Sequence, residues 1–386
     1  MKIYLDNNAT TIIDPRVKEA LEPFLSNEFA NPSSPYESGM KVRRRLEEAR
    51  SSVARLIDAS SEREIFFTSG GTESNNTAIR SALKSFPNKK TIIISAVEHS
   101  SIKQLVEHLS QEGYRVVTIG VSKTGLFNWN QFLDALTDDV AIASIMWANN
   151  ETGVLFPIKK IGRELKQRNI LFHVDAVQAV GKTPVNLKDT DINYLSFSAH
   201  KFHGPKGIGV LYVRESSPFH ALMIGGRQER DRRAGTENVA GIMGLEAALK
   251  LTQENDLNQI AELRNKLEEE FVEKVSGSFI NGKAESRIPN TTNITIPGIE
   301  AETFLIRLSE LGIEASSGSA CLTGALEPSH VLMAMGHTSE SASGSIRFSL
   351  SRFTTEGQID ETLRVIPKLI DELRKLNERP VAMRQA

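Results

Sequence analysis

The sequence predicts an α/β protein in which a mainly parallel sheet of seven strands precedes a smaller α+β region. The first observation is a series of short apolar segments rich in β-branched and aromatic residues, namely EIFFT, TIIIS, RVVTI, VAIASIM, ILFHVD, INYLSFS and GVLYV. The second is that helical patterns such as NNTAIRSALKSF separate most of these segments, as in parallel sheets covered by helices. The third is the length of 386 residues, which suits two domains.

Two helices are predicted before the first strand of this sheet. In DPRVKEALEPFL, Asp14 is the expected N-cap and Pro15 the expected first helical residue. The apolar residues on one face of this helix are Val17, Leu21, Phe24 and Leu25. The second helix is KVRRRLEEARSSVARLI, and we expect its run of charges to face the solvent.

The pattern changes after about residue 255, where a long helical segment, DLNQIAELRNKLEEEFVEKV, is followed by the spaced strands TTNITIP and SIRFSLS. We therefore expect a large domain over residues 14–256 and a small domain formed by residues 1–13 and 257–386. Because GVLYV follows GPKG closely, the last two strands of the large sheet are expected to be antiparallel.

Composition and charge exclude several classes of function. The 46 basic and 48 acidic residues give a formal net charge of −2, which argues against binding to nucleic acids or anionic membranes. No apolar segment reaches membrane-spanning length, and MKIYLDNNATT is not a signal peptide. We therefore expect a cytoplasmic protein, or an organelle-matrix protein if a leader was removed. The single cysteine, Cys321, excludes an internal disulfide and leaves either a buried apolar residue or a reactive thiol.

Polar residues follow five of the seven predicted strands. The segments that begin where these strands end are SGGTESNN, AVEHSS, WANNETG, DAVQAVGK and AHKFHGPKG. Since ligands bind at the carboxyl ends of strands in open α/β sheets, this edge is the expected site. SGGTESNN fits a phosphate held at a helix N-terminus, or an ordinary turn with Thr72 or Ser74 as the helix cap. It is neither a dinucleotide fingerprint nor a nucleotide P-loop.

Ionisable residues in these segments each allow two interpretations. Asp175 ends an apolar strand, where it is either a helix cap or the counter-ion of a buried cation such as a protonated ring nitrogen, with Gln178 one helical turn later. His99 is either a cap or a ring that stacks on a flat ligand and moves protons. His200 and His203 have metal-ligand spacing, but without a cysteine or acidic partner nearby, so we do not expect a metal site.

Lys201 is the residue on which the functional interpretation depends. It follows the apolar alternation of INYLSFSAH and precedes a Gly-Pro turn, so we expect a dry site in which its pKa falls and its amine becomes nucleophilic. A lysine for an aldehyde, an aspartate for a ring nitrogen, a glycine and hydroxyl loop for a phosphate and a histidine for a ring fit one molecule. That molecule is pyridoxal 5′-phosphate.

These segments resemble those of a known family. TSGGTESNN, EHSS, NNETG, HVDAVQ, SFSAHKFHGPKG, RRAGTEN and SSGSACLTGALEPSH occur in the order found in cysteine desulfurases of the NifS/IscS type, which are class V pyridoxal 5′-phosphate enzymes with the type I transferase fold. The resemblance extends from YLDNNATT to SIRFSLSRFTT, nearly the whole chain. It implies that L-cysteine is converted to L-alanine with a persulfide on Cys321, and that the sulfur passes to a NifU/IscU-like iron–sulfur scaffold.

The resemblance also implies a role for individual residues. Lys201 resembles the lysine that binds the cofactor aldehyde, Asp175 the partner of the ring nitrogen and His99 the stacked imidazole. The residues similar to those around the ring oxygen and the phosphate are Asn150, Gln178, Gly71, Thr72, Ser198 and His200. Thr236 resembles a phosphate ligand donated by the second subunit of a homodimer, and Arg347 resembles the clamp for the substrate carboxylate.

Cys321 resembles the sulfur-accepting nucleophile of the family. Its surroundings, SSGSACLTGALEP, are small and polar, which favours an exposed thiol in a loop over a buried cysteine. We also expect Cys321 as a candidate iron–sulfur ligand shared with a scaffold. Two alternatives remain open: a related aminotransferase or selenocysteine lyase that does not need Cys321, and a non-catalytic protein that retains the fold and binds no cofactor.

Overall fold

The computed structural model describes residues 2–318 and 328–377. Within them the main feature is a seven-stranded sheet with the order β2-β8-β7-β6-β5-β3-β4. Its strands are β2 (Ile65–Thr68), β3 (Thr91–Ser95), β4 (Arg115–Ile119), β5 (Val140–Met146), β6 (Leu171–Asp175), β7 (Tyr194–Ser198) and β8 (Gly209–Val213). The contacts from β4 to β7 are parallel, whereas β8 is antiparallel to both β7 and β2. The predicted α/β class and the predicted antiparallel pair are confirmed.

Helices cover both faces of this sheet. Because successive side chains of a strand point to opposite faces, neighbouring residues pack against helices on opposite sides. Ile92 and Ile94 of β3 pack with α4 and α5, whereas Ile93 lies in the core on the other side. The helices of this part of the chain are α1 (Pro15–Leu21), α2 (Pro23–Ser26), α3 (Glu37–Leu56), α4 (Gly71–Ser85), α5 (Ser100–Gln111), α6 (Trp129–Asp134), α7 (Ile158–Gln167), α8 (Gln228–Asp231) and α9 (Val239–Leu251). With both faces buried, the central strands β5, β6 and β7 are buried at every residue and mainly apolar, and the buried His173 on β6 makes hydrogen bonds with Ser144 and Ser196 of the neighbouring strands.

The first two predicted helices differ from the structure in detail. Asp14 caps α1 by accepting a hydrogen bond from the Arg16 N–H, at 2.8 Å, as expected. The helix ends at Leu21 and a separate short helix begins at Pro23, which leaves Leu25 exposed, so its predicted place on the apolar face is wrong.

The charged face of the second helix, α3, is not wholly solvent-exposed as expected. Arg50 is only 2 % exposed, and its two terminal nitrogens bind the Glu229 carboxylate at 2.6 and 2.9 Å. An ion pair with two parallel hydrogen bonds compensates the guanidinium for the water that it loses on burial, so Arg50 can be buried.

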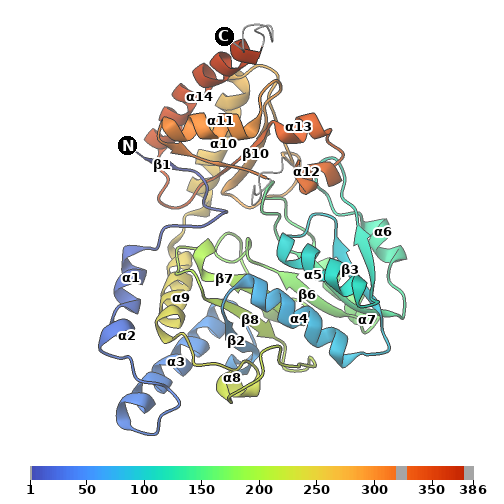
Figure 1. Ribbon diagram of the computed structural model, residues 1–386, viewed down its shortest axis with the longest axis vertical. Helices are drawn as coiled ribbons and strands as arrows, with labels where there is room; N and C mark the ends of the chain where they lie inside the picture. The colour runs from blue at the N-terminus through green and yellow to red at the C-terminus, as the bar shows by residue number, and fades with distance from the viewer. Residues whose placement is uncertain (1, 319–327, 378–386) are drawn as a thin grey trace.

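A second core forms around a smaller sheet with the order β12-β13-β10-β9, and a two-stranded parallel pair, β1-β11, lies beside it. Figure 1 shows these elements in a separate part of the molecule from the large sheet, with the N-terminal segment running between the two parts. The elements are β1 (Ile3–Tyr4), α10 (Leu257–Lys274), β9 (Phe279–Ile280), β10 (Thr291–Thr295), α11 (Ala301–Glu310), β11 (Ile313–Glu314), β12 (Ser316–Ser317), β13 (Ser345–Ser349) and α14 (Glu356–Asn377). Two short helices of the same stretch of sequence, α12 (His330–Ala334) and α13 (Ser339–Ser343), instead bury Val331, Leu332 and Ala342 in the core of the large sheet. The expected domain bounds stay a prediction.

Among the described residues, no helix is both long enough and apolar enough to cross a membrane.

The close approach of β8 to the turn after β2 fixes one wall of the edge where the predicted site lies. A side-chain carbon on Gly209 would lie 2.6 Å from the Gly70 Cα and 2.7 Å from the Phe197 carbonyl oxygen. Both atoms belong to the backbone and cannot rotate away. Only glycine therefore lets β8 support the turn formed by Gly70 and Gly71.

We predict that Gly209→Ala lowers the free energy of unfolding by about 1–3 kcal/mol, because the added methyl group overpacks this contact. Urea denaturation measures the change. Gly357→Ala is the matched control, because a methyl group there meets no atom within 4 Å and it lies in helix α14. Equal stability of Gly209→Ala and the wild-type protein would contradict this account.

Candidate active site

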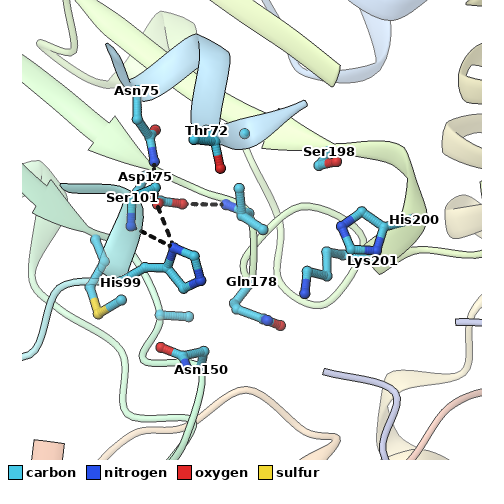
Figure 2. A pocket seen from close by; sticks show the side chains of 14 residues that line it. Thr72, Asn75, His99, Ser101, Asn150, Asp175, Gln178, Ser198, His200 and Lys201 are labelled. Atoms are coloured by element: carbon cyan, nitrogen blue, oxygen red, sulfur yellow. Dashed lines mark hydrogen bonds between the residues drawn. The ribbon is translucent and has the colours of Figure 1, made fainter. Parts of the chain in front are cut away.

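A cavity of about 220 Å³ lies at the carboxyl ends of the large-sheet strands, at the edge that the sequence indicates. The predicted residues that line it are Gly71, Thr72, His99, Asn150, Asp175, Gln178, Ser198, His200 and Lys201. Figure 2 shows His99 and Lys201 on opposite sides of this cavity. Two predicted residues are not among those that line it: Thr236 borders a second cavity, of about 160 Å³, together with Ser69 and Arg233, and Arg347 lies on β13. Cys321 lies outside the described residues.

Lys201 ends a short 3₁₀ turn, Ala199–Lys201, directly after β7. Its Nζ donates hydrogen bonds to the carbonyl oxygens of Asn8 and Ala9, both at 2.7 Å. Burial, together with the positive charge of Arg347, lowers the pKa of Lys201 from 10.5 to about 8, although Asp6 and Asp175 oppose the shift. A larger share of uncharged amine is therefore present near neutral pH than at an exposed lysine, as a nucleophile or base requires.

Asp175 is the last residue of β6 and is 5 % exposed. Its Oδ1 accepts a hydrogen bond from the Val177 N–H at 3.0 Å, which is the cap interpretation. Its Oδ2 accepts from the Asn75 Nδ2 at 2.8 Å and borders the cavity, so the same carboxylate is also placed to meet a cationic ligand. Asn75 was not predicted; its position in the first turns of α4, after the glycine turn, is the signal that could have found it.

His99 precedes α5 and belongs to the same hydrogen-bonded chain. The Ser101 N–H donates to the His99 Nδ1 at 3.1 Å, so the neutral ring carries its proton on Nε2. The Asn75 Nδ2 also donates to the Ser101 Oγ at 2.9 Å, and that oxygen lies 3.0 Å from the His99 Nδ1. Burial lowers the pKa of His99, although the Asp175 charge opposes the shift. The cavity therefore has a neutral imidazole, that of His99, which is connected to the Asp175 carboxylate through the hydrogen bonds of Ser101 and Asn75.

The H-x-x-H pair does not converge on one point. His200 Nδ1 lies 3.1 Å from the Thr10 Oγ1, and His203 Nδ1 lies 3.0 Å from the Ile12 carbonyl oxygen. Burial lowers the pKa of each imidazole to about 4. In the part of the chain that the structure describes, no group of three or more histidine, cysteine or acidic residues could hold a metal ion.

Asn8 is the site residue that sequence reasoning missed most clearly. It is 1 % exposed, and its carbonyl oxygen accepts hydrogen bonds from the Nζ of Lys201 and, at 3.0 Å, from the Gln178 Nε2. Its Oδ1 accepts from the Nζ of buried Lys182 at 2.8 Å. Its Nδ2 donates to the Asn150 carbonyl oxygen at 3.1 Å. The polar run in YLDNNATT, between an apolar strand and a helix, is the only signal of this role.

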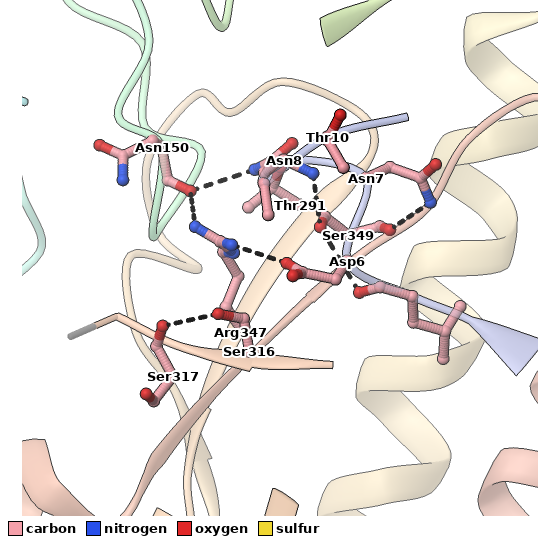
Figure 3. A network of polar contacts seen from close by, with 12 residues as sticks. Asp6, Asn7, Asn8, Thr10, Asn150, Thr291, Ser316, Ser317, Arg347 and Ser349 are labelled. Atoms are coloured by element: carbon pink, nitrogen blue, oxygen red, sulfur yellow. Dashed lines mark hydrogen bonds and ion pairs between the residues drawn. The ribbon is translucent and has the colours of Figure 1, made fainter. Parts of the chain in front are cut away.

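Arg347 lies at the boundary between the two sheets, in the network drawn in Figure 3. Its Nη2 contacts the Asp6 Oδ1 at 2.7 Å, and its Nη1 donates to the Asn150 carbonyl oxygen at 3.1 Å. The Nε is buried without a hydrogen-bond partner among the described residues. These contacts hold the guanidinium plane in place and use two of its five N–H groups, so the remaining groups fit a carboxylate ligand.

Comparison with known proteins agrees with this geometry. The chain matches the Aminotransferase class-V family model over residues 3–362. The chain belongs to the class V aminotransferase family. This class V chain is 48% identical to the cysteine desulfurase NifS of Azotobacter vinelandii, over 97% of this chain and 94% of the relative.

Solved structures give the same result. A NifS-like protein superposes with a TM-score of 0.90 at 37% identity, covering 96% of this class V chain and all of its own. A structure described as SspA in complex with cysteine superposes at 0.82, with 32% identity over 92% of this chain and 100% of its own. The predicted resemblance to NifS-type cysteine desulfurases is confirmed.

We predict that the lowered pKa of Lys201 is visible in its reactivity. Hydroxylamine first removes any carbonyl compound bound to the lysines of the class V protein. The rate of acetylation of Lys201 by a trace of reagent, measured against pH, should then reach half of its maximum near pH 8 rather than near pH 10.5. A lowered pKa frees the amine at lower pH, so labelling rises earlier. Peptide mass spectrometry measures it, with exposed Lys18 in the same digest as the control for reagent decay. A midpoint for Lys201 above pH 10 would contradict the account.

Proposed function

We propose that this protein is a pyridoxal 5′-phosphate-dependent cysteine desulfurase, which converts L-cysteine to L-alanine and takes the sulfur as a persulfide on Cys321. The observation that carries this proposal is that Lys201, Asp175 and His99 line one cavity in a class V chain whose relatives at 48% identity are named cysteine desulfurases.

The residues around the cavity fit pyridoxal 5′-phosphate. An amine of lowered pKa suits its aldehyde, a carboxylate its ring nitrogen, and a neutral imidazole its ring face. Helix α4 starts at Gly71, and Gly70 supplies no capping side chain, so the N-terminal N–H groups suit a phosphate. The residues proposed to hold that phosphate with Gly71 are Thr72, Ser198 and His200. Asn150 and Gln178 are proposed to lie beside the ring oxygen.

The cofactor, when bound, supplies an aldehyde that binds the substrate amine and a ring that withdraws electrons from the substrate α-carbon. Arg347 is proposed to bind the substrate carboxylate through its remaining N–H groups. Lys201, whose lowered pKa makes its uncharged form more available near neutral pH than that of an exposed lysine, is proposed to remove the proton from the α-carbon. Asp175 is proposed to pair with the ring nitrogen of the cofactor, and His99, with its proton on Nε2, can exchange a proton with the substrate thiol.

The sulfur step is assigned to Cys321. Its thiolate attacks the substrate sulfur, so that a sulfur–sulfur bond forms and the carbon–sulfur bond breaks. The electron pair of the broken bond stays on the carbon skeleton, which takes up one proton at the β-carbon, regains one at the α-carbon and leaves as L-alanine. The persulfide then transfers to an acceptor thiol by chemistry akin to disulfide exchange. A NifU/IscU-like acceptor, an iron–sulfur ligand role of Cys321 shared with it, and a cytoplasmic location stay predictions.

We predict that the purified protein with L-cysteine and a thiol reductant releases equal amounts of alanine and sulfide. Lys201→Ala should lower this rate at least about 100-fold, because a general base is lost. Cys321→Ser should keep the cofactor colour but release no sulfide. Lys159→Ala, at an exposed lysine, is the control and should match wild type. Release of a keto acid would favour an aminotransferase, and full sulfide release by Cys321→Ser would refute the persulfide.

We further propose a homodimer in which Thr236 binds the cofactor phosphate of the partner subunit. Support comes from its position: Thr236 borders the second cavity and is not among the residues that line the Lys201 cavity of its own chain. Loss of one phosphate hydrogen bond is expected to weaken cofactor binding about tenfold.

We predict that mixed dimers show whether each Thr236 binds the cofactor phosphate of its own subunit or of the partner subunit. Thr236→Ala should weaken cofactor binding and, at limiting cofactor, activity. Co-expression with Lys201→Ala, purified through two different tags, should restore one normal site per dimer, because the Thr236→Ala subunit keeps Lys201 and receives Thr236 from its partner. Cofactor titration followed by absorbance measures this. If Thr236 served its own subunit, the mixed dimer would contain no site of normal affinity.

A further inference from the structure

The turn that follows β5 connects the cavity to the second sheet. Within it, the Asn149 Oδ1 accepts hydrogen bonds from the N–H groups of Glu151, at 3.0 Å, and Thr152, at 2.9 Å, and from the Thr152 hydroxyl at 3.1 Å. Asn150 lines the cavity, and its carbonyl oxygen holds Arg347. This turn is therefore fixed by its own hydrogen bonds, and one residue of it has no role so far: Glu151.

The Glu151 carboxyl group is buried, with 1 % of the residue exposed, and lies between two points of the chain. Its Oε2 accepts a hydrogen bond from the Ser329 Oγ at 2.5 Å. A side-chain carbon placed on Gly318 would lie only 1.9 Å from the same oxygen and 3.1 Å from the Ser329 Cβ. Gly318 and Ser329 therefore meet at one carboxyl group, and in the sequence they enclose residues 319–328, which include Cys321.

Both points are also tied to the cavity by separate contacts. His330 Nε2 lies 3.0 Å from the Glu98 carbonyl oxygen, and Glu98 directly precedes His99. On the other side, β12 ends at Ser317 and pairs with β13, where Ser316 lies opposite Arg347. The distance from each end of this segment to the proposed substrate site is thus set by described residues, and Glu151 holds the two ends together.

Stability alone does not account for a carboxyl group at this place. Burial raises the pKa of Glu151 to about 7, although Arg347 and Lys103 oppose the shift. Arg347 forms its ion pair with Asp6, at 2.7 Å, rather than with Glu151. A buried ionisable group costs free energy that a neutral side chain of similar size would not. The contacts that this carboxyl group makes at that cost are its hydrogen bond with Ser329 and its close approach to Gly318.

We propose that Glu151 is a positioning residue that fixes both ends of the Cys321 segment against the substrate site and so sets the rate of sulfur transfer to Cys321. It acts through Ser329 and Gly318 and contacts neither substrate nor cofactor. The inference rests on the proposed function, because it assigns the sulfur step to Cys321.

The test uses the full-length enzyme with bound cofactor and separates two readouts. The first is the absorbance change of the cofactor on rapid mixing with L-cysteine, which reports steps before sulfur transfer. The second is the single-turnover rate of persulfide formation on Cys321, measured by mass spectrometry of quenched samples. Glu151→Ala should lower the second rate about 10- to 100-fold, as expected for loss of alignment, and leave the first within about threefold.

Two further variants sharpen the test. Glu151→Gln keeps an oxygen that accepts from Ser329 and should restore most of the persulfide rate. Gly318→Ala forces a methyl group against the carboxylate and should lower that rate as Glu151→Ala does. In the double variant Gly318→Ala/Glu151→Ala the methyl group has room, so its effect should be smaller than in the wild-type background. Ser345→Ala, which removes a buried hydroxyl bonded to Thr295, is the matched control.

The outcomes are separable. The proposal is overturned if Glu151→Ala and Gly318→Ala both form persulfide at the wild-type rate, or if both readouts fall together, which would indicate general disruption of the site. It is also overturned if the two substitutions are additive. Should Glu151→Ala not fold, Glu151→Gln and Gly318→Ala alone decide. If wild type forms no persulfide on Cys321, the proposed function fails instead, and the same series reveals it.

Discussion

The structure depends on one buried residue, Asn8, which makes hydrogen bonds through both its side chain and its backbone. Its partners come from the segments that follow strands of the large sheet and from the smaller sheet and its approach: Lys201, Gln178, Lys182, Asn150, Asn290, Thr291 and Ser349. An amide can accept and donate at once, so it can join a lysine on one side to a carbonyl on the other. No charged residue could serve all these partners, because a carboxylate cannot donate and an ammonium cannot accept.

Burial of several cations near one another sets the electrostatics of the site. Lys182 is bound only by the amide oxygens of Asn8 and Gln178 among its described hydrogen bonds, and burial lowers its pKa well below 10.5, with Lys201 and Arg347 adding repulsion. Arg347 in turn lowers the pKa of Lys201. Arginine keeps its charge under these conditions, whereas burial shifts a lysine toward its uncharged form. The arrangement therefore places a permanent cation beside a lysine that loses its proton more readily than an exposed lysine does.

Sequence reasoning succeeded where a residue type and a strand end coincide. Asp175 ends a buried strand, and Lys201 and His99 follow two others. Parallel strands bring such ends to one edge, so the meeting of these residues at one cavity was predictable. Asn75 and Asn8 escaped because asparagine is common in turns and caps, and its type alone does not indicate a partner. Arg50 was misjudged because the glutamate that neutralises it lies far away in the sequence, at Glu229, where no local pattern connects the two.

The turn after β5 shows why the site needs rigidity at one point in particular. Asn150 presents its side chain to the cavity and its carbonyl oxygen to Arg347, and Glu151 reaches Ser329. Any rotation of this backbone would move all three contacts at once. The three hydrogen bonds accepted by the Asn149 Oδ1 remove that freedom without any contact to a ligand. Because the same short turn touches the cavity, the arginine and the ends of the Cys321 segment, it couples their positions more tightly than separate loops could.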